Sequence, residues 1–185
     1  SKGYSVALQL DTVFARTMSF LRDAMKVEEF CLLLDEETQE LRVWDADPTA
    51  LEVTRDITFA LGEGVTGRAA ASGEPVLVQD TGADGCYLSY KGALDGIGSL
   101  LSVPLRTDDG QILGVLNIHK REKNGFRDGD ECFFVAVAHH LAHALDRARR
   151  YEAAQQAAMH DGLTGLLNRQ ALMEAAEREV NRAAR

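Results

Sequence analysis

The chain has few basic residues for its length. Among 185 residues, 20 Lys and Arg stand against 29 Asp and Glu, which gives a formal net charge of −9 at pH 7. Nucleic-acid binding requires clustered Lys and Arg, because these side chains displace the counterions of the phosphates. The charge balance therefore argues against a nucleic-acid-binding surface, and we expect no nucleic-acid partner.

Cysteines and long apolar runs are also scarce. Cys31, Cys86 and Cys132 are odd in number and contain no CxxC pair, which is typical of reduced thiols and not of a disulfide framework. The most apolar stretch, CFFVAVAHHLAHAL, is interrupted by three histidines and falls short of the roughly 20 apolar residues that span a bilayer. We therefore expect a cytoplasmic location and no membrane span in this segment.

Hydrophobic periodicity predicts a mixture of helices and strands. Apolar residues recur every three or four positions over about residues 5–26 and again from about 128 to 159, which indicates two helices. The segments FCLLLD and LRVWD predict one hairpin, and SLLSVPL and QILGVLNIHK predict another around Asp109 and Gly110. Residues 46–55, between the first hairpin and DITFALGEG, read as a loop.

The middle of the chain contributes shorter elements. DITFALGEG reads as a strand that ends in glycines, and VTGRAAAS reads as a short helix that Gly73 would close in a left-handed cap. VLVQD is a predicted strand, and residues 80–98 form an irregular connection. Together the elements predict an α+β domain, with five or six strands in an antiparallel sheet and the N- and C-terminal helices packed on one face.

Two local patterns resemble sites that their context does not support. Residues 62–67 spell GxGxxG, but Glu63 would stand beside the phosphates of a dinucleotide, so we interpret the pattern as a structural turn. His139 and His143 have the i, i+4 spacing of a metal pair on a helix. No cysteine or carboxylate stands at an obvious third-ligand position, so the sequence predicts no metal site.

Four segments in order carry a family resemblance. LGEGVTGRAAASGEPVLVQD, SLLSVPLRTDDGQILGVLNIHK, Phe126 and DECFFVAVAHHLAHAL resemble a GAF domain over about residues 5–148. GAF domains are small-molecule-sensing and dimerisation modules. The resemblance therefore implies a sensor domain at 1–148 whose ligand pocket lies on the sheet face opposite the helices, roofed by residues 80–98. The family binds cyclic nucleotides, tetrapyrroles, haem and small metabolites, so the fold alone does not identify a ligand or cofactor.

The resemblance also implies pocket positions. In cyclic-nucleotide-binding members an aromatic residue stacks on the purine, and Trp44 matches it, followed by Asp45. The implied ligand-binding set is Phe30, Trp44, Asp45, Val65, Thr66, Tyr87, Ser99 and Asn117. Phe30 and Asn117 replace more polar or acidic residues, which disfavours guanine recognition. The alternative is that Phe30 and Trp44 are core residues around a vestigial pocket.

A further motif of those members implies a structural bridge. His119-Lys120, Phe126 and Asp130-Glu131 keep the spacing of an Asn-Lys, Phe, Asp-Glu motif. In that family the Lys and the Asp hold the last strand against the last helix, so we expect Lys120 and Asp130 to meet. Two other ligand classes are disfavoured, because Cys86 lacks the flanking pattern of a bilin site and GIGSLLSVPL lacks the cysteine of GAF proteins that reduce free methionine sulfoxide.

The end of the chain resembles a different family. In HDGLTGLLNR, six residues match the DxLTGLxNR start of GGDEF diguanylate cyclase domains: Asp161, Leu163, Thr164, Leu166, Asn168 and Arg169. We therefore expect a linker helix at 149–160 and the truncated start of a GGDEF domain at 161–185. The catalytic residues of such a domain would follow residue 185, so we expect this chain to be catalytically inert.

The long helix connects the two parts. Residues with heptad spacing indicate a seam for a parallel homodimer, supported by the N-terminal helix, although its first half could instead face its own sheet. The seam comprises Phe134, Val137, Leu141, Ala144, Ala148, Tyr151, Gln155 and Ala158. The predicted function is control of a diguanylate cyclase by a small-molecule ligand. The alternatives are a ligand-free dimerisation scaffold, a cyclic-nucleotide-binding GAF domain, and an enzyme acting on a metabolite, which the lack of a Cys or Ser near a base disfavours.

Overall fold

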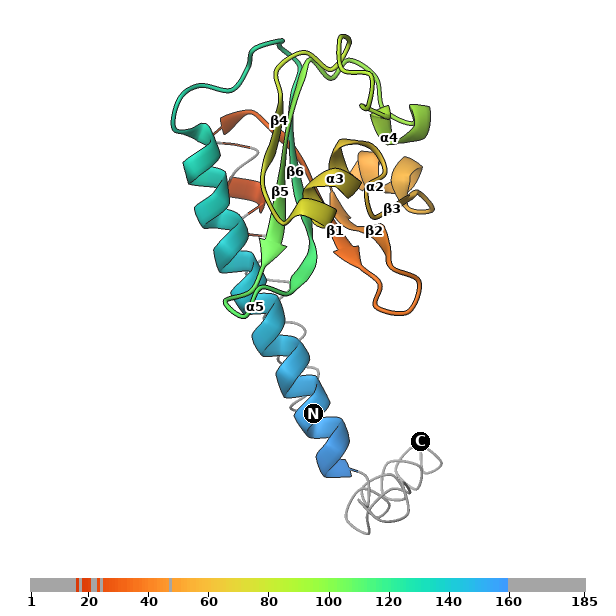
Figure 1. Ribbon diagram of the computed structural model, residues 1–185, viewed down its shortest axis with the longest axis vertical. Helices are drawn as coiled ribbons and strands as arrows, with labels where there is room; N and C mark the ends of the chain where they lie inside the picture. Colours follow the sequence, from red (N-terminus) through yellow and green to blue (C-terminus); the bar gives the residue numbers. More distant parts are fainter. Residues whose placement is uncertain (1–15, 17, 21–22, 24, 47, 160–185) are drawn as a thin grey trace, which may run out of the picture.

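The computed structural model describes residues 16, 18–20, 23, 25–46 and 48–159, and Figure 1 shows their arrangement. Within these residues, six strands form one sheet in the order β3-β2-β1-β6-β5-β4, and all neighbouring strands are antiparallel. The strands are β1 (Glu28–Leu34), β2 (Glu40–Ala46), β3 (Thr58–Ala60), β4 (Val76–Val78), β5 (Ser99–Arg106) and β6 (Ile112–Lys120). The predicted α+β fold with an antiparallel sheet is confirmed.

Helix α5 (Asp130–Met159) packs against one face of this sheet and extends beyond it (Figure 1). Gly129 has a φ of +94°, outside the helical region, so the helix begins at Asp130 and not at Asp128 as expected. The core beneath the helix is a cluster of buried apolar residues from the N-terminal segment, the central strands and α5. It includes Met18, Cys31, Leu101, Val103, Leu105, Leu116, Ile118, Phe134, Ala138 and Leu141.

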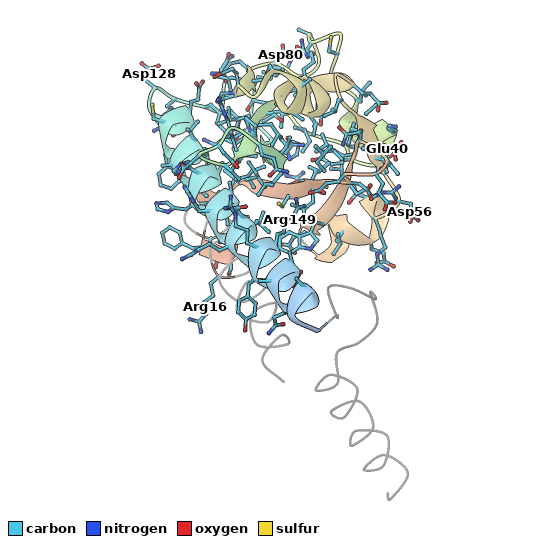
Figure 2. The ribbon with its side chains drawn as sticks, turned by 60° about the horizontal axis from the view of Figure 1, so that its bottom comes forward. Arg16, Glu40, Asp56, Asp80, Asp128 and Arg149 are labelled. Atoms are coloured by element: carbon cyan, nitrogen blue, oxygen red, sulfur yellow. The ribbon has the colours of Figure 1, made fainter. Side chains whose placement is uncertain are left out.

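Figure 2 shows α5 from its far end, with side chains filling the space between the helix and the strands. Arg149, labelled there, forms an ion pair of 3.3 Å with Glu36 of the β1–β2 turn, so the helix also meets this hairpin. Phe134, Leu141 and Ala148 of the predicted seam are buried in the chain's own fold. These three seam residues therefore face the chain's own fold, the arrangement that the sequence left open for part of the seam.

The other face of the sheet carries three short helices, α2 (Pro48–Thr54), α3 (Gly64–Ser72) and α4 (Ser89–Gly92) (Figure 1). The sequence predicts a loop where α2 forms, because seven residues, about two turns, are too few to show an apolar helical period. A second core cluster lies here and includes Phe30, Leu32, Leu41, Phe59, Ala69, Ala70, Tyr90 and Val115. No helix in the described part of the chain is both long and apolar enough to cross a membrane.

The glycine pattern before α3 is a structural turn, as the sequence predicts. Gly62 and Gly64 have φ angles of +85° and +63°, and the Gly62 N–H donates to the Gly67 carbonyl at 2.9 Å. A Cβ added to Gly67 would lie 2.2 Å from the carbonyl oxygen of Ala60. The predicted left-handed cap at Gly73 is also present, with a φ of +70°.

Gly67→Ala should destabilise the domain, because its methyl group meets rigid backbone and forces α3 away from β3. We expect a loss of about 1–3 kcal/mol in the free energy of unfolding, measured by urea denaturation. Gly85→Ala is the matched control, since a Cβ there has no atom within 4 Å. Equal stabilities of the two variants would contradict the proposed close approach.

Candidate functional site

The candidate site is a group of buried polar side chains on the sheet face opposite α5. Asn117 of β6 is fully buried, and its Nδ2 donates to Thr66 Oγ1 at 2.8 Å and to the Tyr90 hydroxyl at 2.7 Å. Ser102 of β5 lies opposite Asn117 in the strand register and donates to its Oδ1 at 2.6 Å. We call Thr66, Ser102 and Asn117 the polar floor. A buried amide whose hydrogens are both donated is fully satisfied.

Tyr90 fills the space above the polar floor. Its side chain is 2% exposed, and its ring centroid lies 4.6 Å from that of Phe30 and 5.5 Å from that of Phe59. Burial raises the pKa of Tyr90 well above its ordinary value, so the hydroxyl keeps its proton. The Tyr90 ring thus occupies the place where the sequence predicts a ligand.

The segment that carries Tyr90 has a strained backbone. Ser89, Tyr90 and Lys91 have φ angles of +44°, +49° and +55°, and each such angle in a residue other than glycine costs on the order of 1–3 kcal/mol. Lys91 also pairs with Glu63, which precedes α3, at 3.2 Å. The contacts of the buried Tyr90 ring hold this segment against the sheet.

His119 lies two residues beyond Asn117 and on the same face of β6. Its ring packs against Phe30 and Tyr90, with centroid distances of 5.1 and 5.5 Å. Burial lowers the pKa of His119 to about 3, so the imidazole is neutral near pH 7. Among the described residues, the Glu28 backbone comes close enough to the ring to raise this pKa in part, but no contact of either ring nitrogen has the geometry of a hydrogen bond. A buried polar group without a well-formed hydrogen bond is unfavourable, and a ligand could supply one.

The cavity beside Tyr90 is small, at about 10 Å³, which is hardly room for a water molecule. Its lining includes residues of α3, the segment before α4 and β5: Phe59, Val65, Thr66, Tyr87, Leu88, Ser89, Tyr90 and Leu100. A larger hollow of about 720 Å³ lies between the β1–β2 turn and α5. That hollow contains none of the predicted ligand-binding residues.

Comparisons with known proteins identify the family. The model of the GAF domain family matches residues 7–146. The chain belongs to the GAF domain family. This GAF domain is a sensory module of the kind found in signalling proteins. It is 30% identical over 108 residues to the dual 3′,5′-cyclic-AMP and -GMP phosphodiesterase 11 of Drosophila melanogaster, a match that spans 57% of this chain but only 7% of that protein.

Two solved structures share the fold of this GAF domain. The GAF domain of a phosphoenolpyruvate-protein phosphotransferase from Coxiella burnetii has a TM-score of 0.65 at 20% identity, covering 83% of this chain and 99% of that one. The free methionine-R-sulfoxide reductase of Neisseria meningitidis, solved with its substrate, has a TM-score of 0.64 at 22% identity, covering 82% and 94%. At these identities the likeness concerns the fold alone.

The GAF fold brings five of the eight predicted ligand-binding residues to one face. Val65, Thr66 and Tyr87 line the small cavity, and Phe30 and Asn117 contact Tyr90 beneath it. The structure adds residues that the sequence analysis missed. Ser102 and His119 could have been found from strand alternation, since they share a face with Asn117. Tyr90 had no such signal, because it lies in an irregular segment.

Trp44, Asp45 and Ser99 lie elsewhere, contrary to the expectation. Trp44 packs against the core cluster under α5. Its neighbour Val43 belongs to the cluster on the opposite face, so the alternation of side chains along β2 already places Trp44 on the α5 face. A β-bulge beside Trp44 then aligns Asp45 with Cys31, which also faces α5. The Ser99 hydroxyl donates to the Glu122 carbonyl at 2.8 Å.

The predicted bridge between the last strand and the last helix is present. Lys120 Nζ lies 3.0 Å from Asp130 Oδ2, and their side chains are 14% and 20% exposed. Lys120 also donates to the Gly125 carbonyl at 2.8 Å and lies over the Phe126 ring. Burial disfavours the charged form of Asp130, but the Arg127 N–H and Lys120 together hold its pKa below the ordinary 3.8. The bridge thus joins β6 to the first turn of α5.

Asp130→Asn should destabilise the domain at neutral pH and progressively less in acid. A depressed pKa contributes stability above the ordinary value, and this contribution disappears as the pH falls through the folded-state pKa. We expect a difference from the original chain of about 1–3 kcal/mol at pH 7 that shrinks below about pH 4, measured by denaturation at each pH. His119 titrates in both proteins, so the difference isolates Asp130. The exposed Asp128→Asn is the control, and a pH-independent difference for Asp130→Asn would refute the bridge.

Proposed function

We propose that this chain is the non-catalytic, regulatory GAF sensor of a cytoplasmic, diguanylate-cyclase-type signalling protein. In this proposal a small planar ligand replaces the Tyr90 ring on the polar floor. One observation carries it: buried polar groups, including the His119 ring without a well-formed hydrogen bond, lie under a strained segment that reaches them through the Tyr90 side chain. The strain lowers the free energy needed to lift that segment.

The chemistry of the slot favours a flat ligand with a polar edge. Phe30 and Phe59 supply aromatic surfaces around the Tyr90 ring, while Asn117 offers both a donor and an acceptor. A nucleobase has this combination of a π-face and a hydrogen-bonding edge. The name of the Drosophila relative supports cyclic nucleotides as the first compounds to test. Trp44 is not part of this slot, so stacking would fall to Phe30 or Phe59.

The route to an output runs through α5. The same strand that carries Asn117 is bridged to the start of α5 by Lys120 and Asp130. The residues that match the start of a GGDEF domain, Asp161–Arg169, follow this helix and lie outside the described residues. A cyclase of this type requires two GTP-holding domains to face each other, so a change in the pairing of two α5 helices would alter its rate.

Exposed apolar side chains support pairing of two copies along α5. Phe133 and Tyr151 are 42% and 38% exposed, and Phe20 of the N-terminal segment is also exposed. Phe133, Val137, Ala144 and Tyr151 follow four- and seven-residue spacing on one side of the helix. This stripe, the proposed homodimer contact, keeps Val137, Ala144 and Tyr151 of the predicted seam, the first two of them half-buried, and leaves out Phe134, Leu141 and Ala148, which are buried in the chain's own core.

A second function, a dimerisation scaffold without a ligand, is favoured by one observation. The cavity above the polar floor has a volume of only about 10 Å³. The three residues of the floor and the Tyr90 hydroxyl already form hydrogen bonds with one another. If the Tyr90 segment never opens, the domain would serve only to pair two chains. The following experiment separates the two functions.

Tyr90→Ala should create a binding site for planar molecules. We would titrate the original chain, Tyr90→Ala and the control Tyr151→Ala with nucleobases, nucleosides and cyclic nucleotides by calorimetry. Mass spectrometry would identify small molecules released from the denatured original chain. The original chain must first expel the Tyr90 ring, so we expect about tenfold or tighter binding to Tyr90→Ala and no gain for Tyr151→Ala. Absence of any bound compound in all three proteins would favour the scaffold.

Pairing along α5 should control a cyclase joined to this chain. We would continue residues 1–185, in register with the DxLTGLxNR segment, into an active diguanylate cyclase domain and measure cyclic di-GMP formed from GTP. Tyr151→Glu places charge on the proposed contact and should lower the rate about tenfold or more, because like charges oppose pairing. Ala153→Glu adds the same charge on the opposite side of the helix and should have little effect. Equal rates for the two variants would argue against this contact.

A further inference from the structure

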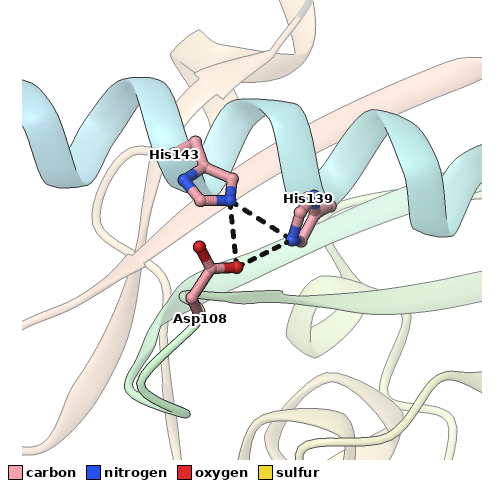
Figure 3. Close-up of side chains that lie close together, drawn as sticks. All are labelled: Asp108, His139 and His143. Atoms are coloured by element: carbon pink, nitrogen blue, oxygen red, sulfur yellow. Dashed lines mark hydrogen bonds and ion pairs between the residues drawn. The ribbon is translucent and has the colours of Figure 1, made fainter.

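Two histidines of α5 and an aspartate of the β5–β6 turn converge at one point. His139 and His143 lie one helical turn apart, and their rings both point toward Asp108 (Figure 3). The three ligand atoms form a nearly equilateral triangle, with 3.3 Å between the two Nε2 atoms. The distances from Asp108 Oδ1 are 3.3 Å to His139 Nε2 and 3.2 Å to His143 Nε2. Local sequence spacing does not predict this carboxylate, because Asp108 lies 31 residues before His139.

The size of this triangle is that of one face of a metal coordination tetrahedron. With metal–ligand bonds of about 2.0–2.1 Å, two corners of a tetrahedron lie about 3.3–3.4 Å apart. Without a metal, both Nε2–H groups can donate to Asp108 Oδ1, but no hydrogen bond then joins the two nitrogens, which lie 3.3 Å apart. A cation at the centre accepts a lone pair from all three atoms at once. We propose that Asp108, His139 and His143 bind a divalent transition-metal cation of the Zn²⁺ class.

The donor set decides which class of cation fits. Imidazole nitrogen suits Zn²⁺ and its neighbours in the transition series, whereas Ca²⁺ and Mg²⁺ are bound through oxygen ligands. Asp108 and His139 are exposed and His143 is half-buried, so a cation enters from solvent and keeps water at its fourth position. The sequence-based prediction of no metal rested on the missing third ligand, which the fold supplies.

The ligands are held in place before any cation arrives. The Thr107 hydroxyl donates a hydrogen bond to the Asp109 carboxylate and accepts one from the backbone N–H of Gln111. These two hydrogen bonds fix the turn around Asp108. Asp109 pairs with Arg150 of α5 at 3.7 Å, so the turn already contacts the helix. Arg150 is neutralised by Asp146 at 2.8 Å as well, which limits its repulsion of a cation. A bound metal would clamp the β5–β6 turn to the middle of α5.

The test uses the metal-stripped 185-residue chain and the variants His139→Ala, His143→Ala and Asp108→Asn. Co²⁺ is the first probe, because a tetrahedral site gives it strong visible absorption, and Zn²⁺ should displace it with a stoichiometry of one per chain. Each variant should weaken Zn²⁺ binding by about tenfold or more. His140→Ala, which removes an exposed neighbouring histidine, should bind as tightly as the original chain.

Zn²⁺ should also raise the melting temperature of the original chain and of His140→Ala, but not of His143→Ala. Asp108 and His139 are exposed and His143 is half-buried, so the metal-free variants should melt close to the original chain, and the rise in melting temperature on adding Zn²⁺ is compared with each protein's own metal-free value. No binding to the original chain, a weak octahedral Co²⁺ spectrum, or an equal loss in His140→Ala would overturn the proposal. These readouts need neither a pocket ligand nor a cyclase, so they are independent of the proposed function.

Discussion

Strand β6 serves both faces of the sheet, and the rest of the domain depends on how its side chains alternate. Leu116 and Ile118 pack beneath α5, while Asn117 and His119 belong to the opposite face. Successive side chains of a strand point to opposite faces. Along β6, Asn117 of the polar floor is therefore adjacent to residues that pack beneath α5. In the proposed function, a ligand that displaced β6 would therefore act on a strand that itself packs against α5.

In the proposed function, Tyr90 and a ligand are alternative occupants of the polar face. The Tyr90 hydroxyl accepts a hydrogen bond from Asn117, and its ring packs against Phe30. Its backbone, however, belongs to a run of three positive φ angles, and the His119 ring nitrogens form no well-aligned hydrogen bond among the described residues. A ligand that replaces Tyr90 must supply the lost contacts, yet it relieves the strain and can pair the imidazole. Such a near-balance is what a two-state sensor requires, because a modest difference in affinity then shifts the population.

The sequence predicts the fold well where periodicity is strong. The two hairpins, the Gly73 cap and the long helix follow from local patterns, and the Lys120–Asp130 pair follows from the family motif. The site is predicted less well because its members come from irregular backbone or lie beside an irregularity. A bulge reverses the face of Asp45, the segment of Tyr90 has no period, and Asp108 meets two histidines only because the β5–β6 turn folds against α5.

The three cysteines differ in their surroundings. Cys31 is buried under α5, where burial and then the nearby Asp45 charge raise the pKa of its thiol, which makes it chemically inert. Cys86 and Cys132 are exposed, one in the segment before α4 and the other in the first turn of α5. The chain therefore offers two exposed thiols for labelling, one on the segment before α4 and one on α5. Paired spectroscopic labels on Cys86 and Cys132 would report the distance between the segment before α4 and α5, without any substitution.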